Sequence, residues 1–298
     1  MNRLRDICGN ANVLYNEPMK KHTSFRTGGE AKVVVKPQSK EKLVEIIKYL
    51  KDTSLEYTVV GNGSNLLVSD DGFDGVVVLT ECIDHVYCDG DRIIAGCGVS
   101  LAKIAGVALN NSLKGFEFAS GIPGFAGGGV VMNAGAYGGE LKDVLEKVEY
   151  CDEAGNVFCV DGKDAHLSYR HSMFSDERLY VLESTFKLEK GNKDEISALM
   201  NELASRRLEK QPLNYPSAGS AFKRPEGYFA AKLIEDSGLK GYSIGDACVS
   251  EKHCGFIVNK GNAKALDIYK LIKHCQKTVF EKQGVMIYPE IKFLGKFE

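Results

Sequence analysis

The stretch SGIPGFAGGGVVMNAGAYGGE, residues 120–140, has the most unusual composition in this sequence. It holds eight glycines, which are too many for an ordinary helix, because a helical glycine costs about 1 kcal/mol relative to alanine. It is also too apolar for a solvated linker, so its backbone is expected to pack closely against something. Glycine at this density lets a flat or charged cofactor lie on the main chain; a tight turn between two sheets is the alternative.

A second glycine-rich loop, GNGSN at residues 61–65, directly follows a predicted strand at 57–60. Backbone N–H groups in such a turn can converge on an anion such as a pyrophosphate. An ordinary strand-ending loop fits the pattern equally well. The loop has neither the dinucleotide-binding pattern GxGxxG nor the phosphate-binding pattern that ends in GK[ST].

The segments around these loops predict a mixture of strands and helices. A strand at 31–36, a helix capped by Ser39 and the strand at 57–60 resemble a βαβ unit. Further strands are predicted at 75–79, 92–95, 144–150, 157–160, 180–188, 255–258 and 291–294. Further helices are predicted at 101–108, 194–209, 229–236 and 268–279. Pro212 and Pro216 mark the best candidate linker.

Length and composition indicate a globular protein. The 298 residues suggest about two domains, and 44% hydrophobic with 26% charged residues argue against disorder. A net charge of -2 gives no basic excess that would suggest a dedicated nucleic-acid binder. Nine cysteines without CxxC or zinc-like spacing are interpreted as free thiols in a reducing cytosol. With no signal peptide or long apolar run, we expect a cytoplasmic α/β or α+β protein without membrane insertion.

Three polar residues are candidates for chemistry, and each has an ordinary alternative. Arg170, in YRHSMF, could clamp a carboxylate or stabilise an enolate, but a surface ion pair is more common. Ser220, in SAGSAFK, lies in a glycine turn, where a serine usually caps the backbone. Glu290 precedes the last strand and could equally be a solvated carboxylate. No histidine has a metal-ligand spacing, so no metal is expected.

Six segments in order resemble the UDP-N-acetylenolpyruvoylglucosamine reductase family, flavoenzymes of bacterial peptidoglycan synthesis and cell-wall biogenesis. They are HTSFRTGG (22–29), VGNGSNLLVS (60–69), residues 120–140, YRHSMF (169–174), KQPLNYPSAGSAFKRP (210–225) and residues 288–294. The resemblance covers nearly the whole chain and is to the shorter, type II branch. That branch lacks the segment whose tyrosine covers the substrate in longer relatives. Ala221 departs from the bulkier apolar residue common beside the serine.

The resemblance implies an α+β fold. It consists of a two-subdomain α/β FAD-binding region of vanillyl-alcohol-oxidase type and a C-terminal α+β substrate-binding domain. The implied boundaries are 1–74 for the first FAD-binding subdomain, 75–205 for the second and 206–285 for the substrate domain. The last strand, within 286–298, is expected to return to the first subdomain.

The resemblance also implies an activity, namely NADPH-dependent reduction of UDP-N-acetylglucosamine enolpyruvate to UDP-N-acetylmuramate with FAD as cofactor. Hydride would pass from reduced flavin to the enolpyruvyl group. Arg170 would stabilise the enolate that develops, Ser220 would deliver the proton, and Glu290 would orient the carboxyl group or the proton relay.

Two sets of binding residues follow from the same resemblance. The residues expected to line FAD are Gly61, Asn62, Gly63, Ser64, Asn65, Ser120, Gly121, Pro123, Gly124, Gly128, Asn133 and Gly135. The residues expected to contact substrate are Tyr137, Arg206, Lys210 and Lys223, of which Arg206 and Lys210 suit a diphosphate.

Two other functions stay open at this point. An oxygen-using flavin oxidase of the same fold would be favoured by a covalent flavin, but residues 120–140 contain no histidine to carry one. A UDP-sugar binder without chemistry is the other alternative. The presence of Arg170, Ser220 and Glu290 together argues against it.

Overall fold

The computed structural model describes residues 2–297, apart from the side chain of Asp176. The chain forms two compact units. The first unit comprises Met1–Leu14, Val33–Asn62 and Gly75–Arg207, and the second comprises Tyr15–Lys32, Gly63–Asp74 and Leu208–Glu298. The division into three domains predicted from the sequence stays a prediction. In the described residues, no helix combines the length and the apolarity that crossing a membrane requires.

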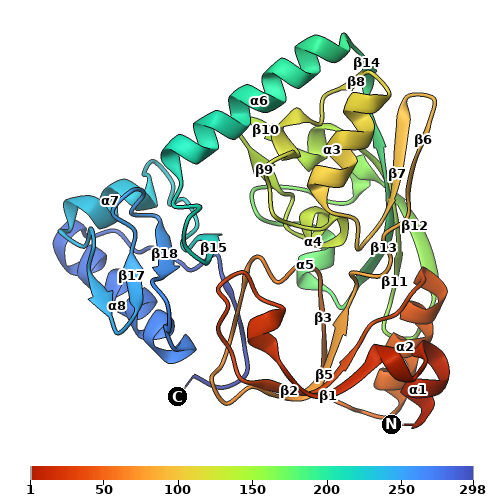
Figure 1. The fold of residues 1–298 in the computed structure, drawn as a ribbon, viewed down its shortest axis with the longest axis horizontal. Helices are drawn as coiled ribbons and strands as arrows, with labels where there is room; N and C mark the ends of the chain where they lie inside the picture. The colour runs from red at the N-terminus through yellow and green to blue at the C-terminus, as the bar shows by residue number, and fades with distance from the viewer. Residues whose placement is uncertain (1, 298) are drawn as a thin grey trace. The chain divides into compact units, whose positions relative to one another are not determined.

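The first unit contains a five-stranded antiparallel sheet of order β12-β11-β13-β7-β6 (Figure 1). Its strands are β6 (Val86–Asp89), β7 (Arg92–Gly96), β11 (Leu145–Cys151), β12 (Val157–Asp161) and β13 (Tyr180–Lys187). Helix α3 (Leu101–Asn110) packs on β6 and β7, and α4 (Ala126–Val131) packs on β7 and β13. The predicted helical face of Leu101, Ile104, Ala105 and Ala108 is buried, which confirms that helix.

A second sheet has the strand order β1-β2-β5-β3. Its strands are β1 (Val13–Pro18), β2 (Glu30–Val35), β3 (Tyr57–Val60) and β5 (Phe73–Leu79), and β3 pairs with β5 in parallel. Helix α2 (Lys40–Asp52) lies between β2 and β3 in sequence, and the Ser39 side chain accepts a hydrogen bond from the Lys42 N–H, as an N-cap does. The predicted strand–helix–strand order is therefore confirmed, although β5 separates β2 from β3 in the sheet.

The second unit contains an antiparallel sheet of order β15-β18-β17-β16 with two helices, α7 and α8 (Figure 1). These elements are β15 (Ser217–Ser220), β16 (Ser243–Ile244), β17 (Ala247–Val249), β18 (Phe256–Asn259), α7 (Ala230–Asp236) and α8 (Ala265–Gln283). Helix α8 packs on β16 and β17. Strand β4 (Leu66–Val68) pairs in parallel with the last strand, β19 (Lys292–Leu294).

Shorter elements and one long helix complete the described chain. They are α1 (Asn2–Cys8), η1 (Asn10–Asn12), η2 (Met19–Lys21), β8 (Leu113–Lys114), η3 (Glu117–Ala119), β9 (Gly135–Ala136), β10 (Gly139–Glu140), η4 (Leu141–Asp143), η5 (Gly162–Asp164), α5 (Met173–Asp176), β14 (Glu189–Lys190) and α6 (Lys193–Lys210). The boundary between the two units falls within α6, after Arg207.

The prediction that residues 120–140 hold too many glycines for a helix is wrong for part of this segment, because residues 126–131 form the helix α4. Its glycines permit very close packing inside the first unit. A Cβ at Gly127 would lie 2.9 Å from the Cβ of Cys97, and one at Gly129 would lie 3.1 Å from Leu141 Cδ1. Burial of the helix between these neighbours offsets the low helix propensity of glycine.

Candidate active site

The two predicted cofactor loops meet in the first unit. The Asn62 side chain donates a hydrogen bond of 2.7 Å from Nδ2 to the carbonyl oxygen of Pro123. A Cβ at Gly61 would lie 3.6 Å from the Cβ of Phe125, which is ordinary van der Waals contact. Residues 61 and 62 of the GNGSN loop therefore lie directly beside residues 123–125.

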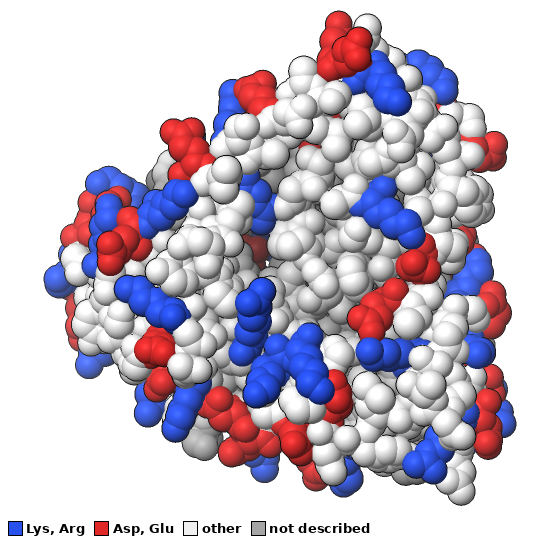
Figure 2. Space-filling view, in the orientation of Figure 1, with Lys and Arg blue, Asp and Glu red and all other residues white. Residues whose placement is uncertain are grey.

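Some residues of the 120–140 segment are exposed, and others are packed inside the protein. Gly121, Pro123 and Gly128 are exposed, and a Cβ at Gly128 would meet no atom within 4 Å. Figure 2 shows mainly uncharged surface over α4. Backbone that lies bare and uncharged on one face fits a flat cofactor such as the flavin part of FAD.

Other predicted cofactor residues are engaged inside the protein. Ser120 Oγ donates to the Glu117 carbonyl at 2.8 Å, and the Gly124 carbonyl accepts from the Leu101 N–H at 3.0 Å. A Cβ at Gly135 would lie 2.7 Å from the Gly139 carbonyl oxygen, so this glycine is required by the β9–β10 hairpin. These contacts fix the shape of the glycine segment.

Arg170 lies in a tight turn of the first unit. Ser168 and His171 pair across this turn, and Arg170 itself has a left-handed φ of 55°. The guanidinium carbon lies 5.5 Å from the centroid of the Tyr169 ring, and the side chain is half-buried. The pKa of the nearby Glu140 carboxyl is lowered first by its hydrogen bond from Lys142, and further by Asn133 and by the charge of Arg170.

Ser220 and Glu290 come together in the second unit. Ser220 ends β15, and the next residue, Ala221, accepts a 2.9 Å hydrogen bond from the Glu290 N–H. Asn65 Nδ2 donates to the Glu290 carbonyl oxygen at 3.0 Å. The Lys223 N–H donates to Tyr288 at 2.8 Å. Backbone and amide contacts thus join the predicted serine turn, the predicted glutamate and the second half of the GNGSN loop.

Gly63 and Ser64 of the GNGSN loop have different surroundings. A Cβ at Gly63 would lie 1.9 Å from the His22 carbonyl oxygen, and its φ is 58°, so only glycine fits there. Ser64, by contrast, is half-buried. The structure assigns both to the second unit, together with Ser220 and Glu290, whereas Arg170 belongs to the first.

The predicted substrate residues are mostly exposed. Tyr137 is 44% exposed and adopts a left-handed φ of 54°. Lys210 is exposed at the end of α6, and Lys223 is exposed three residues after Ser220. Arg206 is exposed and pairs with Glu202 of its own helix at 2.5 Å, as a solvated helix end would.

Arg207 is the residue that sequence analysis missed. A Cβ at Gly121 would lie 3.2 Å from Arg207 Nη1, so the guanidinium group covers the exposed start of the glycine segment. Desolvation lowers the pKa of Arg207, while the neighbouring Tyr137 acts in the opposite direction. The doublet Arg206-Arg207 was visible in the sequence, but only the rotation of α6 decides which arginine faces residues 120–140.

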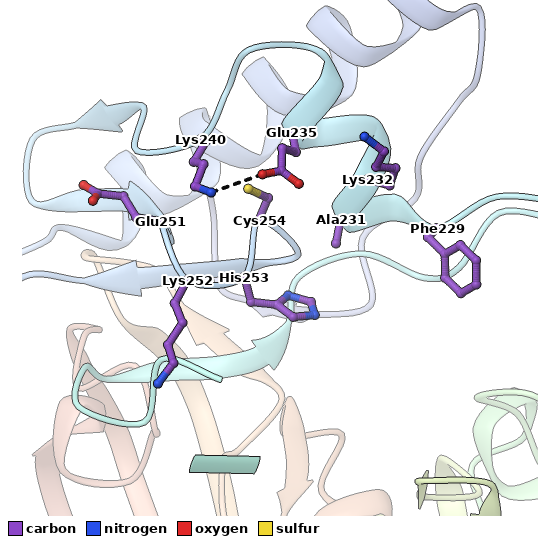
Figure 3. A pocket seen from close by; sticks show the side chains of 9 residues that line it. All are labelled: Phe229, Ala231, Lys232, Glu235, Lys240, Glu251, Lys252, His253 and Cys254. Carbon is purple, nitrogen blue, oxygen red and sulfur yellow. Dashed lines mark hydrogen bonds and ion pairs between the residues drawn. The ribbon is translucent and has the colours of Figure 1, made fainter. Parts of the chain in front are cut away.

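A pocket of about 410 Å³ opens in the second unit, and none of the predicted site residues lines it (Figure 3). Its three lysines are already engaged: Lys240 with Glu235, Lys232 with Asp236, and Lys252 with the Leu208 carbonyl. We assign no role to this pocket. Its lining residues are Phe229, Ala231, Lys232, Glu235, Lys240, Glu251, Lys252, His253 and Cys254.

Family models match both parts of the chain. One described as "FAD binding domain" matches residues 31–161, and one described as "UDP-N-acetylenolpyruvoylglucosamine reductase, C-terminal domain" matches residues 211–294. Among curated relatives, UDP-N-acetylenolpyruvoylglucosamine reductase from Caldanaerobacter subterraneus subsp. tengcongensis is 52% identical over 296 residues, covering 99% of this chain and 98% of that protein. The enzyme of that name from Clostridium botulinum (strain Okra / Type B1) is 50% identical over 294 residues, covering 99% and 96%.

Solved structures agree with these relatives. UDP-N-acetylenolpyruvylglucosamine reductase from Thermus caldophilus superposes with a TM-score of 0.80 at 32% identity, covering 95% of this chain and 98% of that one. p-Cresol methylhydroxylase superposes with a TM-score of 0.50 at 12% identity, covering 97% and 65%, which is a likeness of fold.

The fold and the two family models define a flavoprotein with an FAD-binding domain and a separate C-terminal domain. The predicted fold class and the predicted FAD are thereby confirmed. Identity of about half over almost the full length settles the further assignment: the chain belongs to the UDP-N-acetylenolpyruvoylglucosamine reductase family.

Proposed function

We propose that this protein reduces UDP-N-acetylglucosamine enolpyruvate to UDP-N-acetylmuramate with NADPH as reductant. The observation that carries the proposal is a relative named UDP-N-acetylenolpyruvoylglucosamine reductase, which is 52% identical over 99% of this chain. A reductase of this kind supplies a precursor of peptidoglycan. Its location in the cytoplasm stays a prediction from the sequence.

Residues of the two glycine-rich segments would hold FAD. Gly61 and Asn62 supply the loop, Gly128 supplies bare backbone, and Pro123 and Gly121 lie beside them, with Gly121 next to Arg207. When bound, FAD supplies the hydride chemistry that links NADPH to the enolpyruvyl group. The chain's own side chains must then manage the charge and the proton that this chemistry requires.

Arg170 would stabilise the charge that develops on the enolpyruvyl group. Adding hydride to the β-carbon leaves an enolate on the α-carbon and its carboxylate. A fixed cation lowers the energy of that transition state, because it is oriented before the charge appears. The half-buried position of Arg170 in a closed turn supports this role.

Ser220 would deliver the proton to the α-carbon, and Glu290 would orient the carboxyl group or the proton relay. A hydroxyl is a weak acid, so it must lie within about 3 Å of its target and be supplied with a proton by neighbours. The hydrogen bonds that join residues 221 and 290, and 223 and 288, support a common role for Ser220, Glu290 and Lys223.

Basic residues of α6 would contact the diphosphate of the substrate. Arg206 is the weaker candidate, because its guanidinium group is paired with Glu202. Arg207 is the stronger candidate, since it is half-buried against Gly121. Lys210 and Tyr137 are exposed, and both would also contact the substrate.

Anaerobic stopped-flow absorbance tests the proposed function. The protein is purified with FAD, reduced with NADPH, and then mixed with UDP-N-acetylglucosamine enolpyruvate. We expect the yellow flavin band to bleach with NADPH and to return on adding the sugar nucleotide. Return of the band with oxygen alone would indicate the oxidase, and a protein that stays colourless with FAD would indicate a binder.

The variant Ser220→Ala separates the two half-reactions. Bleaching by NADPH should be unchanged, because no proton is delivered to substrate in that step. Reoxidation by the sugar nucleotide should slow by roughly 10²-fold or more, the usual effect of losing a general acid. Normal reoxidation in this variant would remove Ser220 from the mechanism.

A further inference from the structure

The turn that carries Arg170 is a strained piece of backbone. Arg170 has a φ of 55°, a left-handed conformation that costs a residue with a side chain about 1–2 kcal/mol. The turn is closed by two backbone hydrogen bonds between Ser168 and His171, of 3.0 and 3.2 Å. Strained conformations of this kind persist only where surrounding contacts hold them.

Both flanks of this turn are anchored to one short piece of the glycine segment. On one side, Asn133 Nδ2 donates a 3.0 Å hydrogen bond to the carbonyl oxygen of Ser168. On the other, Ser172 Oγ donates a 2.8 Å hydrogen bond to the carbonyl oxygen of Val131. Asn133 is 1% exposed and Ser172 is fully buried, so water cannot replace either contact.

The Asn133 side chain has no donor left for a ligand. Its Nδ2 group also donates to Glu140 Oε2 at 2.9 Å, and its Oδ1 accepts from the Lys142 N–H at 3.0 Å. Both amide hydrogens are therefore used. Asparagine also tolerates the left-handed φ of 42° at this position better than other residues with a side chain do.

We propose that Asn133 is a positioning residue for Arg170, and that its side chain acts through the Ser168 carbonyl and not on the cofactor. The inference rests on the proposed role of Arg170 in the second half-reaction. Asn133 joins the glycine segment, which would carry the cofactor, to the turn that presents the cation. Ser172 supports the same turn from its other end.

A double-mutant cycle tests the proposal with Asn133→Gly, Arg170→Ala and the combined variant. Glycine suits the left-handed backbone, so Asn133→Gly removes the side chain without adding strain. We expect Asn133→Gly to slow reoxidation by the sugar nucleotide about 10-fold or more and to leave reduction by NADPH within twofold. In the Arg170→Ala background the same substitution should change reoxidation by less than about twofold.

Equal slowing by Asn133→Gly in both backgrounds would overturn the proposal, because the effect would then not pass through Arg170. Normal reoxidation in Arg170→Ala would instead show that the proposed role of Arg170 fails. Ser172→Ala provides a second anchor variant if Asn133→Gly does not fold. It should show the same dependence on Arg170, and independence from Arg170 would count against the proposal.

Asn259 in the second unit offers a matched control. It is 2% exposed, donates from Nδ2 to the Phe25 carbonyl, and accepts from two backbone N–H groups. Asn133→Asp and Asn259→Asp each remove the donated hydrogen bonds of a buried asparagine. We expect both to lower the urea midpoint and only Asn133→Asp to slow reoxidation. Equal slowing by both would indicate a general loss of structure and refute the positioning role.

Discussion

Gly128→Ala should make the apoprotein more stable and FAD binding weaker. Gly128 lies within α4, is exposed, and has no atom within 4 Å of its added Cβ. Replacing a helical glycine with alanine gains about 0.5–1 kcal/mol when the new methyl group meets nothing. The same methyl group would stand on the bare backbone that we assign to FAD. Crowding of a packed contact costs about 1–3 kcal/mol, which corresponds to FAD binding about 5- to 150-fold weaker.

Two measurements on the same protein check this prediction. Urea unfolding of the apoprotein, followed by circular dichroism, reports the gain in stability. Titration of the apoprotein with FAD, followed by flavin fluorescence, reports the dissociation constant. A more stable variant with unchanged FAD affinity would refute the assignment of Gly128 to the cofactor surface.

Gly106→Ala is the matched control. Gly106 lies within α3 of the same unit, and its added Cβ also has no atom within 4 Å. It should show the same gain in stability with FAD affinity unchanged. Weaker FAD binding in this variant would mean that the loss at Gly128 is not specific to the site.

Three further predictions concern stability. Gly127→Ala should lower the free energy of unfolding by about 1–3 kcal/mol in urea, because its Cβ would lie 2.9 Å from Cys97; an unchanged urea midpoint would contradict this packing. Asp70→Ala should lower it by about 1–2 kcal/mol, since Asp70 accepts the N–H groups of Ala265 and Leu266 at the start of α8, each at 2.9 Å; Asp70→Asn should lose less. Burial raises the pKa of Cys275 from 9.0 to about 12. The contribution of the buried thiol to the free energy of unfolding is therefore full below about pH 9 and is lost as the pH rises towards 12. Cys275→Ala should show a weaker decline of stability with rising pH than the parent protein.

Most secondary structure could be predicted from the sequence. The helix after Ser39, the apolar face of α3 and the strands at 57–60 and 180–187 follow from local periodicity and capping chemistry. These signals are local because side chains three or four residues apart share a helix face, whatever the rest of the chain does. The family could be recognised for a similar reason, since its motifs are contiguous short segments.

The candidate site residues named from the sequence stay predictions, and their surroundings could not be predicted. Arg206 and Arg207 are adjacent and chemically identical, and only the packing of α6 turns Arg207 towards Gly121. Asn133 was predicted to line FAD, yet its side chain is engaged by Ser168, Glu140 and Lys142. Hydrogen-bond partners 7 to 35 residues apart leave no local signal in a sequence.

The sequence by itself determined the order of the elements, the two glycine-rich segments and the family, because all of these depend on residue type and short spacing. The tertiary structure alone decided that residues 126–131 form a helix, that β5 separates β2 from β3, and which arginine faces the glycine segment. The physical reason is that propensity contributes about 1 kcal/mol per residue, whereas close packing and buried hydrogen bonds contribute several together. Where the two disagree, as in α4, packing determines the structure.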